Sequence, residues 1–162
     1  MNTHIQQAGF TLVEVLIATI LVGLSVSALL TANGTFSMIN GVGADMTTAE
    51  FLMEQFRERT TTLSVLDPQT TTATFGLEEP NMVNADDIDD YDGQAFSPPI
   101  DAAGNALTEF RDFTQRITVE NVSKNDLALV VGDHSSDFVR ISVVVAQNNQ
   151  DITAASWIRA RF

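Results

Sequence analysis

The feature that most constrains this chain is an apolar run near its N-terminus, residues 10–32, in which Glu14 is the only charged side chain. A helix of that length spans about 34 Å at ~1.5 Å per residue, enough to cross a bilayer core of ~30 Å. A carboxylate at the centre of a bilayer costs about 2.5–3.5 kcal/mol, so it is expected to have a partner. The run therefore predicts a transmembrane helix whose single acid has a function.

The start of this run has a specific arrangement: a Gly9-Phe10 junction is followed by Glu14, the fifth residue after the glycine. The arrangement resembles the class III signal of type IV pilins and the related pseudopilins. The resemblance implies that a membrane peptidase cuts between Gly9 and Phe10 and that the new N-terminal Phe10 is methylated. It also implies that Glu14 pairs with the N-terminal amine of a neighbouring subunit, since two charges in apolar surroundings are tolerable only together.

The predicted leader, residues 1–9, contains no Lys or Arg, although a basic flank normally sets the orientation of a membrane helix. The expected location, in a bacterial inner membrane with the C-terminal domain in the periplasm, therefore rests on the motif. A simple membrane anchor is one alternative interpretation. A cleaved secretory signal is another, but its apolar region would be too long and its small-residue cleavage site would fall near residues 32–34.

Composition limits the part of the chain that lies after the apolar run. The chain has 162 residues, enough for one membrane helix and about one small domain. It carries 21 acidic and 8 basic residues, for a net charge of −13, so direct nucleic-acid binding is not expected. It has no cysteine, so the domain must be held by packing, by a metal or by contacts in an assembly.

The apolar helix is expected to continue beyond the membrane as an amphipathic helix. Asn33-Gly34 and the glycines of residues 40–43 should loosen or kink it without ending it, because a helical glycine costs about 1 kcal/mol. Ala49, Leu52, Phe56 and Leu63 then recur on one face. This spacing predicts an amphipathic helix to about residue 62 that packs on a sheet.

The remainder predicts a proline-containing loop followed by strands. Residues 67–106 hold all four prolines and allow one short strand at 73–77. Apolar alternation or apolar runs then indicate strands near 113–120, 127–131, 139–145 and 152–160, with a turn at 148–151. The expected fold is α+β: a long N-terminal helix, with a membrane half and an amphipathic half, packed on a small antiparallel sheet within 113–162. The expected domains are the leader 1–9, the helix 10–32 and an extracytoplasmic domain 33–162.

An acidic run in the loop region is the one candidate metal site, formed by Asp86, Asp87, Asp89, Asp90 and Asp92. Clustered carboxylates suit Ca²⁺, but the spacing does not fit an EF-hand loop, and such runs are commonly solvated. We expect a solvated run and no cofactor, with Ca²⁺ as the alternative. The string from Asp86 to Gly93 also resembles a segment of minor pilins of the mannose-sensitive haemagglutinin pilus type.

No pattern in the sequence indicates an enzyme. The two histidines are His4, in the leader, and His134, which is followed by two serines and Asp137. Consecutive residues in a turn cannot form a catalytic triad, so we expect a turn between strands there. Trp157 is expected in the core or on the sheet surface.

The resemblance and the composition together predict a minor structural subunit of a type IV pilus-like filament. Its expected partners are other pilin or pseudopilin subunits, a prepilin peptidase, an inner-membrane assembly platform and membrane lipid. Two alternatives remain open: a minor pseudopilin of a type II secretion system, and a membrane-anchored acidic binding module that does not polymerise.

Overall fold

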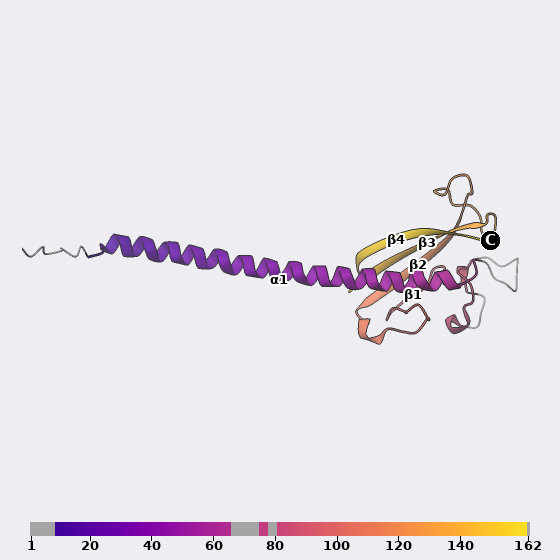
Figure 1. Ribbon diagram of the computed structural model, residues 1–162, viewed down its shortest axis with the longest axis horizontal. Coiled ribbons are helices and arrows are strands. Elements are labelled where there is room, and N and C mark those ends of the chain that lie inside the picture. Colours follow the sequence, from indigo (N-terminus) through magenta and orange to yellow (C-terminus); the bar gives the residue numbers. More distant parts are fainter. Residues whose placement is uncertain (1–8, 66–74, 78–80, 162) are drawn as a thin grey trace, which may run out of the picture. The chain divides into compact units, whose positions relative to one another are not determined.

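The computed structural model describes residues 9–65, 75–77 and 81–161. One helix, α1 (Leu12–Thr62), precedes short 3-10 turns and an antiparallel sheet (Figure 1). The elements after α1 are η1 (Met82–Asn84), η2 (Asp89–Tyr91), β1 (Ala95–Phe96), η3 (Thr108–Phe110), β2 (Phe113–Val122), β3 (Phe138–Gln147) and β4 (Gln150–Ala160). The predicted α+β class is confirmed. The chain divides within α1 into two compact units, Met1–Gly43 and Ala44–Phe162.

In the first unit, the described part of α1 presents apolar side chains on every side and buries none of them. Leu12, Ile20, Leu29 and Phe36 are each more than half exposed. By length and composition α1 can cross a membrane, with a mean hydropathy of 2.4 over its most apolar window. A helix that is apolar all round requires lipid or other proteins around it.

The hydroxyl groups of this apolar segment are satisfied inside the helix itself. Ser25 Oγ donates to the Leu21 carbonyl at 2.8 Å, and Ser27 Oγ donates to the Gly23 carbonyl at 2.9 Å. Thr31 repeats the pattern four residues further on. In surroundings without water an unbonded hydroxyl would be costly, so these bonds fit the segment to an apolar environment.

The two glycine-containing zones do not end α1. Residues 33–34 and 40–43 are helical throughout, as predicted. A Cβ built at Gly34, Gly41 or Gly43 meets no atom within 4 Å, so no packing inside this chain requires glycine there. Glycines on a helix surface allow the backbone of another helix to approach closely.

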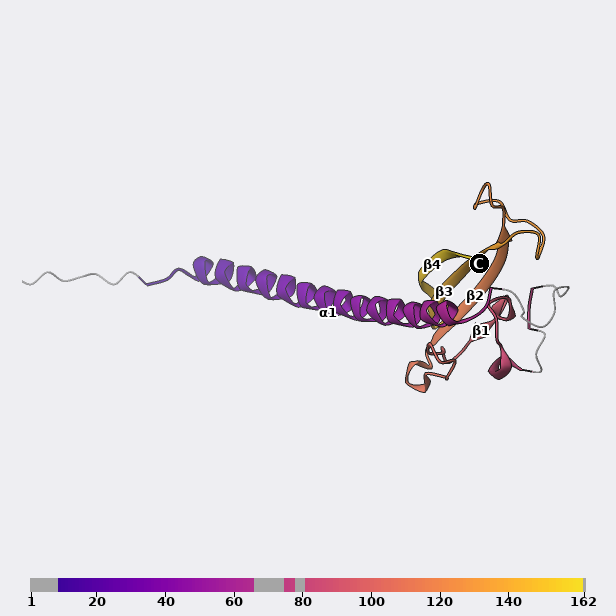
Figure 2. The ribbon, with the colours of Figure 1, turned by 45° about the vertical axis from the view of Figure 1, so that its right-hand side comes forward.

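In the second unit, the C-terminal part of α1 packs on the sheet through the predicted stripe (Figure 1, Figure 2). Ala49, Leu52 and Phe56 are fully buried, at 0 % exposure. The ring of Phe56 meets the ring of Tyr91 edge-on, with 5.3 Å between centroids. Leu63 packs against the same core just after the helix ends. The amphipathic prediction is confirmed in position and in extent.

The sheet is antiparallel in the order β1-β2-β3-β4. Its central strand β3 places four side chains in the core at 0 % exposure: Val139, Ile141, Val143 and Val145. Asn148 and Asn149 join β3 to β4 with φ of 49° and 66°. Asparagine tolerates this left-handed backbone, which suits a two-residue hairpin turn. The predicted strands near 113–120, 139–145 and 152–160 and the turn between the last two are confirmed.

Two strand predictions differ from the structure. The run 127–131 is not a strand: only Val130 makes a bridge, to Val122, and Leu127, Leu129 and Val130 are exposed. Apolar content alone suggested a strand there, but β2 ends at Val122, so the run pairs with β2 only at this end. The fourth strand is instead β1, inside the predicted loop region 67–106, and it pairs with Gln115 and Arg116 of β2. Of the short strand considered at 73–77, residues 73–74 lie outside the described residues, and 75–77 are not in a strand.

One buried polar side chain joins α1, the loop after β1 and β2. Gln115 of β2 is fully buried. Its Nε2 donates to the Leu52 carbonyl of α1 at 2.8 Å, and its Oε1 accepts from the Ile100 amide at 2.8 Å. Because a buried amide must be hydrogen-bonded, these contacts fix the loop against helix and sheet. The alternation of β2 placed Gln115 on the core face, but nothing local in the sequence indicated these partners.

We predict that Leu52→Ala and Phe56→Ala each lower the free energy of unfolding of the second unit by about 2–5 kcal/mol, because each leaves a cavity in the core. The measurement is urea denaturation of a truncated chain starting at Gly43, which we expect to be soluble and folded since it keeps the whole stripe. Thr61→Ala, at an exposed position of the same helix, is the control. Unchanged midpoints for both core variants would contradict the assigned core face.

Candidate processing and assembly site

The N-terminus of α1 is closed by reciprocal hydrogen bonds between Thr11 and Glu14. The Glu14 amide donates to Thr11 Oγ1 at 3.2 Å, and the Thr11 amide lies 3.5 Å from Glu14 Oε2. This is a capping box, in which two of the free amides at a helix start gain side-chain acceptors. The pattern Thr-Leu-Val-Glu indicates this box directly, and it gives Glu14 a role within its own chain in addition to the predicted pairing with another subunit.

The cap explains how a carboxylate is tolerated at the head of an apolar helix. Glu14 lies in the first turn of α1, where the helix dipole favours negative charge by about 0.3–1 kcal/mol. No ion pair involving Glu14 occurs among the described residues, whose ion pairs all lie in the second unit. Among the described residues, the Thr11 amide is the one hydrogen-bond donor to the carboxylate, at Oε2, and Oε1 is left for a cation.

The predicted cleavage site lies immediately outside this cap. Gly9 and Phe10 precede the helix and are exposed, with Phe10 82 % exposed. Peptide carbonyls outside a helix are not engaged in its hydrogen bonds, so this bond can enter an extended binding site of a peptidase. A Cβ at Gly9 would meet no atom within 4 Å, and Gly9 does not have positive φ. Nothing in the described residues therefore requires glycine at position 9.

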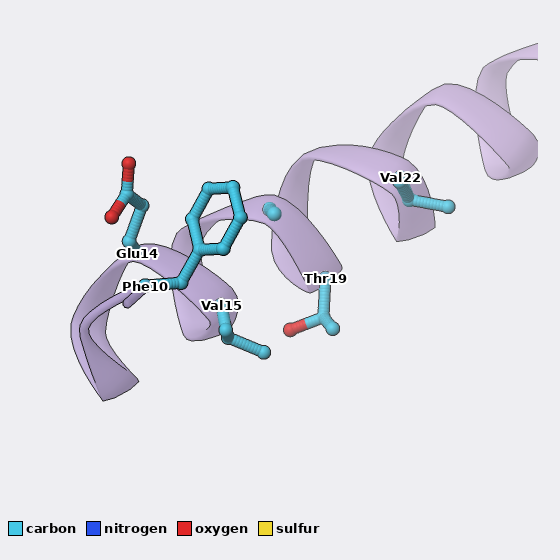
Figure 3. A pocket seen from close by; sticks show the side chains of 6 residues that line it. Phe10, Glu14, Val15, Thr19 and Val22 are labelled. Carbon is cyan, nitrogen blue, oxygen red and sulfur yellow. The ribbon is translucent and has the colours of Figure 1, made fainter. Parts of the chain in front are cut away.

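Phe10 and Glu14 lie side by side at the head of α1 (Figure 3). They border an open hollow of about 450 Å³ whose other walls are Val15, Ala18, Thr19 and Val22 of the same helix face. The structure thus places Phe10 and Glu14 beside the same hollow, while the predicted pairing between two subunits stays a prediction. The hollow is almost wholly apolar, with the Glu14 carboxylate at its edge, so a complementary partner would be apolar with one cation.

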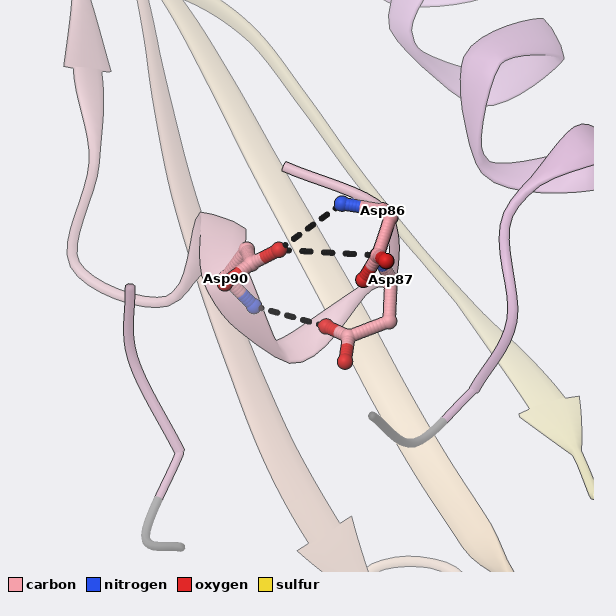
Figure 4. A group of neighbouring side chains, drawn as sticks. All are labelled: Asp86, Asp87 and Asp90. Carbon is pink, nitrogen blue, oxygen red and sulfur yellow. Dashed lines mark hydrogen bonds between the residues drawn. The ribbon is translucent and has the colours of Figure 1, made fainter. Parts of the chain in front are cut away.

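The second candidate site, the acidic run, forms a tight turn against the sheet (Figure 4). Asp90 Oδ2 accepts from the Asp86 amide at 3.0 Å and lies 3.5 Å from the Asp87 amide. Asp87 Oδ1 accepts in return from the Asp90 amide at 3.1 Å. These carboxylates act as local caps that shape η2.

The expectation of a solvated run is wrong. Asp87 is 1 % exposed, and Asp89 and Asp90 are fully buried. Burial of Ile88 and Tyr91, which sit between and beside these aspartates, pulls the carboxylates inside with them. The spacing of the aspartates in the sequence could not predict their burial, because the residues that cover the turn come from other parts of the chain.

Of the five aspartates considered for Ca²⁺, the structure brings three together. Asp86, Asp87 and Asp90 each offer an oxygen within 4.8 Å of the others. Asp92 is used elsewhere, since its Oδ1 accepts from the Val119 amide of β2 at 2.8 Å. Asp89 is not part of the three-carboxylate group. Three carboxylates are fewer ligands than the six to eight oxygens that Ca²⁺ takes, so backbone carbonyls or water would have to complete a site.

Burial changes the acid chemistry of this turn. Removal from water, and next the hydrogen bond and charge of the neighbouring Asp89, raise the pKa of Asp87 from 3.8 to about 8. Burial also raises the pKa of Tyr91 above 10.0, against the opposing effect of Arg59. Asp87 is therefore protonated at neutral pH, which removes one negative charge from a crowded site.

His134, Asp137 and Trp157, which were also considered in the sequence, occupy structural positions. His134 and Asp137 are in the loop between β2 and β3, and His134 has a φ of 58°. Trp157 of β4 packs against the core, and its Nε1 donates to Thr60 Oγ1 at 3.3 Å. His4 lies outside the described residues.

Comparison with known proteins identifies the N-terminal segment. Residues 5–30 match the family model described as the prokaryotic N-terminal methylation motif. This is the type IV pilin class III signal that the resemblance had indicated, and it covers Gly9, Phe10 and Glu14. Neither the curated proteins nor the solved structures gave a match to the chain.

We predict that stability falls as pH rises between about 4 and 8 because of Asp87. In that window the unfolded chain loses the proton of this carboxyl while the folded chain keeps it, since the folded pKa is about 8. The contribution of this proton to the free energy of unfolding is fully present below pH 4 and is lost above pH 8. Asp87→Asn, which imitates the protonated acid, should flatten this slope in urea denaturation at pH 4, 6, 8 and 9.

Asp126→Asn is the matched control, because Asp126 also caps a backbone amide, that of Ala128, but is exposed. Its pH slope should equal that of the parent protein. If Asp87→Asn kept the parent slope as well, the buried protonated state would be excluded.

For the metal alternative, we predict that Ca²⁺ at pH 8 changes the melting temperature only as much as Na⁺ at matched ionic strength. The reason is that Asp87 and Asp90 already cap amides of the turn. A rise specific to Ca²⁺, absent from Asp90→Asn, would instead assign a metal to this cluster.

Proposed function

We propose that the chain is a prepilin-like structural subunit, cleaved between Gly9 and Phe10 and assembled into a filament through α1. One observation carries the proposal: the apolar half of α1 is exposed and packs against none of the other described residues, and its single acid caps the helix beside the predicted cleavage site. The methylation motif over residues 5–30 supports the same interpretation. Such a helix is stored in lipid and is later buried among other helices.

Cleavage would create a positive charge at the new N-terminus, next to the helix start where Glu14 lies. Hydrolysis of the Gly9–Phe10 bond leaves an amine on Phe10, one residue before the cap. On its own chain this amine stands at the positive end of the helix dipole, where a cation is disfavoured. The Glu14 carboxylate of a neighbouring subunit offsets that charge, and the pairing fixes the axial offset between two helices.

The second unit supplies the exposed part of the subunit. Its sheet covers the amphipathic half of α1, and its net acidity keeps it in water. We propose an inner-membrane location with this unit in the periplasm, and partners that comprise other pilin-like subunits, a prepilin peptidase and an assembly platform. The motif and the unpartnered helix support these partners.

Within this class we favour a minor subunit of a type IV pilus. The support is the string from Asp86 to Gly93, which resembles a segment of minor pilins of the mannose-sensitive haemagglutinin type. In the structure this string forms a turn that hydrogen bonds from backbone amides to Asp87 and Asp90 hold in place. A minor pseudopilin of type II secretion is the alternative, and neighbouring genes for pilus or secretion components would decide between the two. Recovery in filaments distinguishes both from an anchored binding module.

We predict that a bulky or charged residue at position 9, as in Gly9→Glu or Gly9→Leu, blocks processing, whereas Gly9→Ala is tolerated. No contact within the described chain depends on Gly9, so any effect reports on the peptidase. Intact-mass spectrometry of the purified protein shows whether the chain begins at Met1 or at a methylated Phe10. A parent protein that keeps Met1 in cells containing the peptidase would overturn the proposal.

We predict that Glu14→Gln leaves membrane insertion and cleavage intact and lowers incorporation into filaments at least tenfold. Glutamine keeps an oxygen that can cap Thr11 but loses the charge that an amine requires. The measurement is recovery with sheared filaments at equal membrane abundance. Glu58→Gln, an exposed acid on the same helix, is the control.

Thr11→Ala separates pairing from capping. It removes the hydroxyl that accepts from the Glu14 amide but retains the carboxylate. If Thr11→Ala and Glu14→Gln reduced incorporation equally, Glu14 would act through the helix cap, and the pairing proposal would fail.

A further inference from the structure

A small pocket in the second unit has the chemistry of a binding site that the filament role does not use. It has a volume of about 200 Å³ and lies between the last turn of α1, the two 3-10 turns after it and the loop after β1. Met82, Phe96 and Ile100 give it apolar walls, while Arg59, Tyr91 and Asn105 contribute polar atoms.

The guanidinium of Arg59 is held in place on two sides. Its Nε donates to the Tyr91 hydroxyl at 2.7 Å, and its Cζ lies 5.7 Å from the centroid of the Tyr91 ring. On another side the backbone of Gly104 approaches so closely that a Cβ there would lie 3.2 Å from Cζ. Gly104 also has a φ of +87°, which favours glycine. A cation fixed in this way loses little entropy when it binds a ligand.

No carboxylate of the described residues pairs with this guanidinium. Among the described residues, the ion pairs are Arg57–Glu54, Arg116–Asp151 and Arg140–Glu120. Arg59 is in none of them. Within that part of the chain its hydrogen bonds use only Nε, so neither Nη group donates a hydrogen bond there, and Arg59 lines the pocket.

These features specify the ligand. Two Nη groups of a fixed arginine match the two oxygens of a carboxylate. Apolar walls favour a short branched or aromatic group beside it. The volume is below the 300–1,000 Å³ of sites for drug-sized ligands, which restricts the ligand to a small acid or a single residue. We propose that the Arg59 pocket binds a carboxylate that carries one small apolar group.

A structural role for Arg59 would explain part of the same geometry. A cation in the last turn of α1 is favoured by the helix dipole, and it lies near the buried aspartates around Tyr91. That role predicts an effect of Arg59 on stability but no saturable response to an added carboxylate. The test therefore measures binding directly.

Tyr91 is the single tyrosine of the chain, so selectively ¹³C-labelled tyrosine places one reporter in the pocket of the full-length protein in detergent micelles. We expect 3-methylbutanoate to shift the Tyr91 ring signals saturably at millimolar concentrations, whereas 3-methylbutanamide should not. Arg59→Gln should weaken binding at least tenfold. Arg57→Gln, two residues earlier and outside the pocket, should change it less than twofold.

Ala103→Leu is a second test of binding in the pocket, for the case in which Arg59→Gln disturbs the fold. Ala103 lines the pocket, and a larger side chain should fill it and weaken binding at least tenfold with Arg59 intact. N-acetyl-leucine against its amide separates the two sources of a carboxylate. Tighter binding than 3-methylbutanoate indicates a peptide chain end, and weaker binding indicates a free acid. Equal responses to acid and amide, or no saturable shift, would overturn the proposal.

Discussion

One continuous helix has to serve two different environments along its length, and the rest of the structure depends on how it does so. The first part of α1 is apolar on all sides, and hydroxyls such as those of Ser25 and Ser27 donate to carbonyls of the same helix. The second part narrows its apolar surface to the stripe of Leu52 and Phe56, which the sheet covers. The same element therefore supplies both a surface for lipid or other helices and one wall of the domain core.

Backbone amides, rather than cations, accommodate many of the acids in this chain. Glu14 and Thr11 cap α1, Asp87 and Asp90 cap a turn, and Asp92 accepts from β2. In the loop after β1, hydrogen bonds led by that from the Asn105 amide hold the pKa of Asp101 below 3.8. With 21 acidic and 8 basic residues, cations are too few to pair with every carboxylate. Arg59 is held in its pocket by Tyr91 and by the close approach of Gly104, and this fixed geometry supports the proposed ligand.

The sequence predicted the elements whose signals are local. The all-apolar run, the stripe from Ala49 to Phe56 and the alternation of β3 each carry their own period, so helix and strands were found close to their observed bounds. Predictions were wrong where long-range pairing decides. The apolar run 127–131 meets only the end of β2, whereas Ala95 and Phe96 form β1 because Gln115 and Arg116 lie beside them.

The motif around Gly9, Phe10 and Glu14 could be read from sequence alone, because an acid in an apolar run and a capping pattern are contiguous features. The buried aspartate turn and the Arg59 pocket could not. Their properties come from desolvation and fixed geometry, which arise only when Tyr91, Gly104 and the end of α1 are brought together by folding. Sequence thus determined the methylation motif and the apolar helix beside it. Tertiary structure decided which carboxyl keeps its proton and which cation stays open to a ligand.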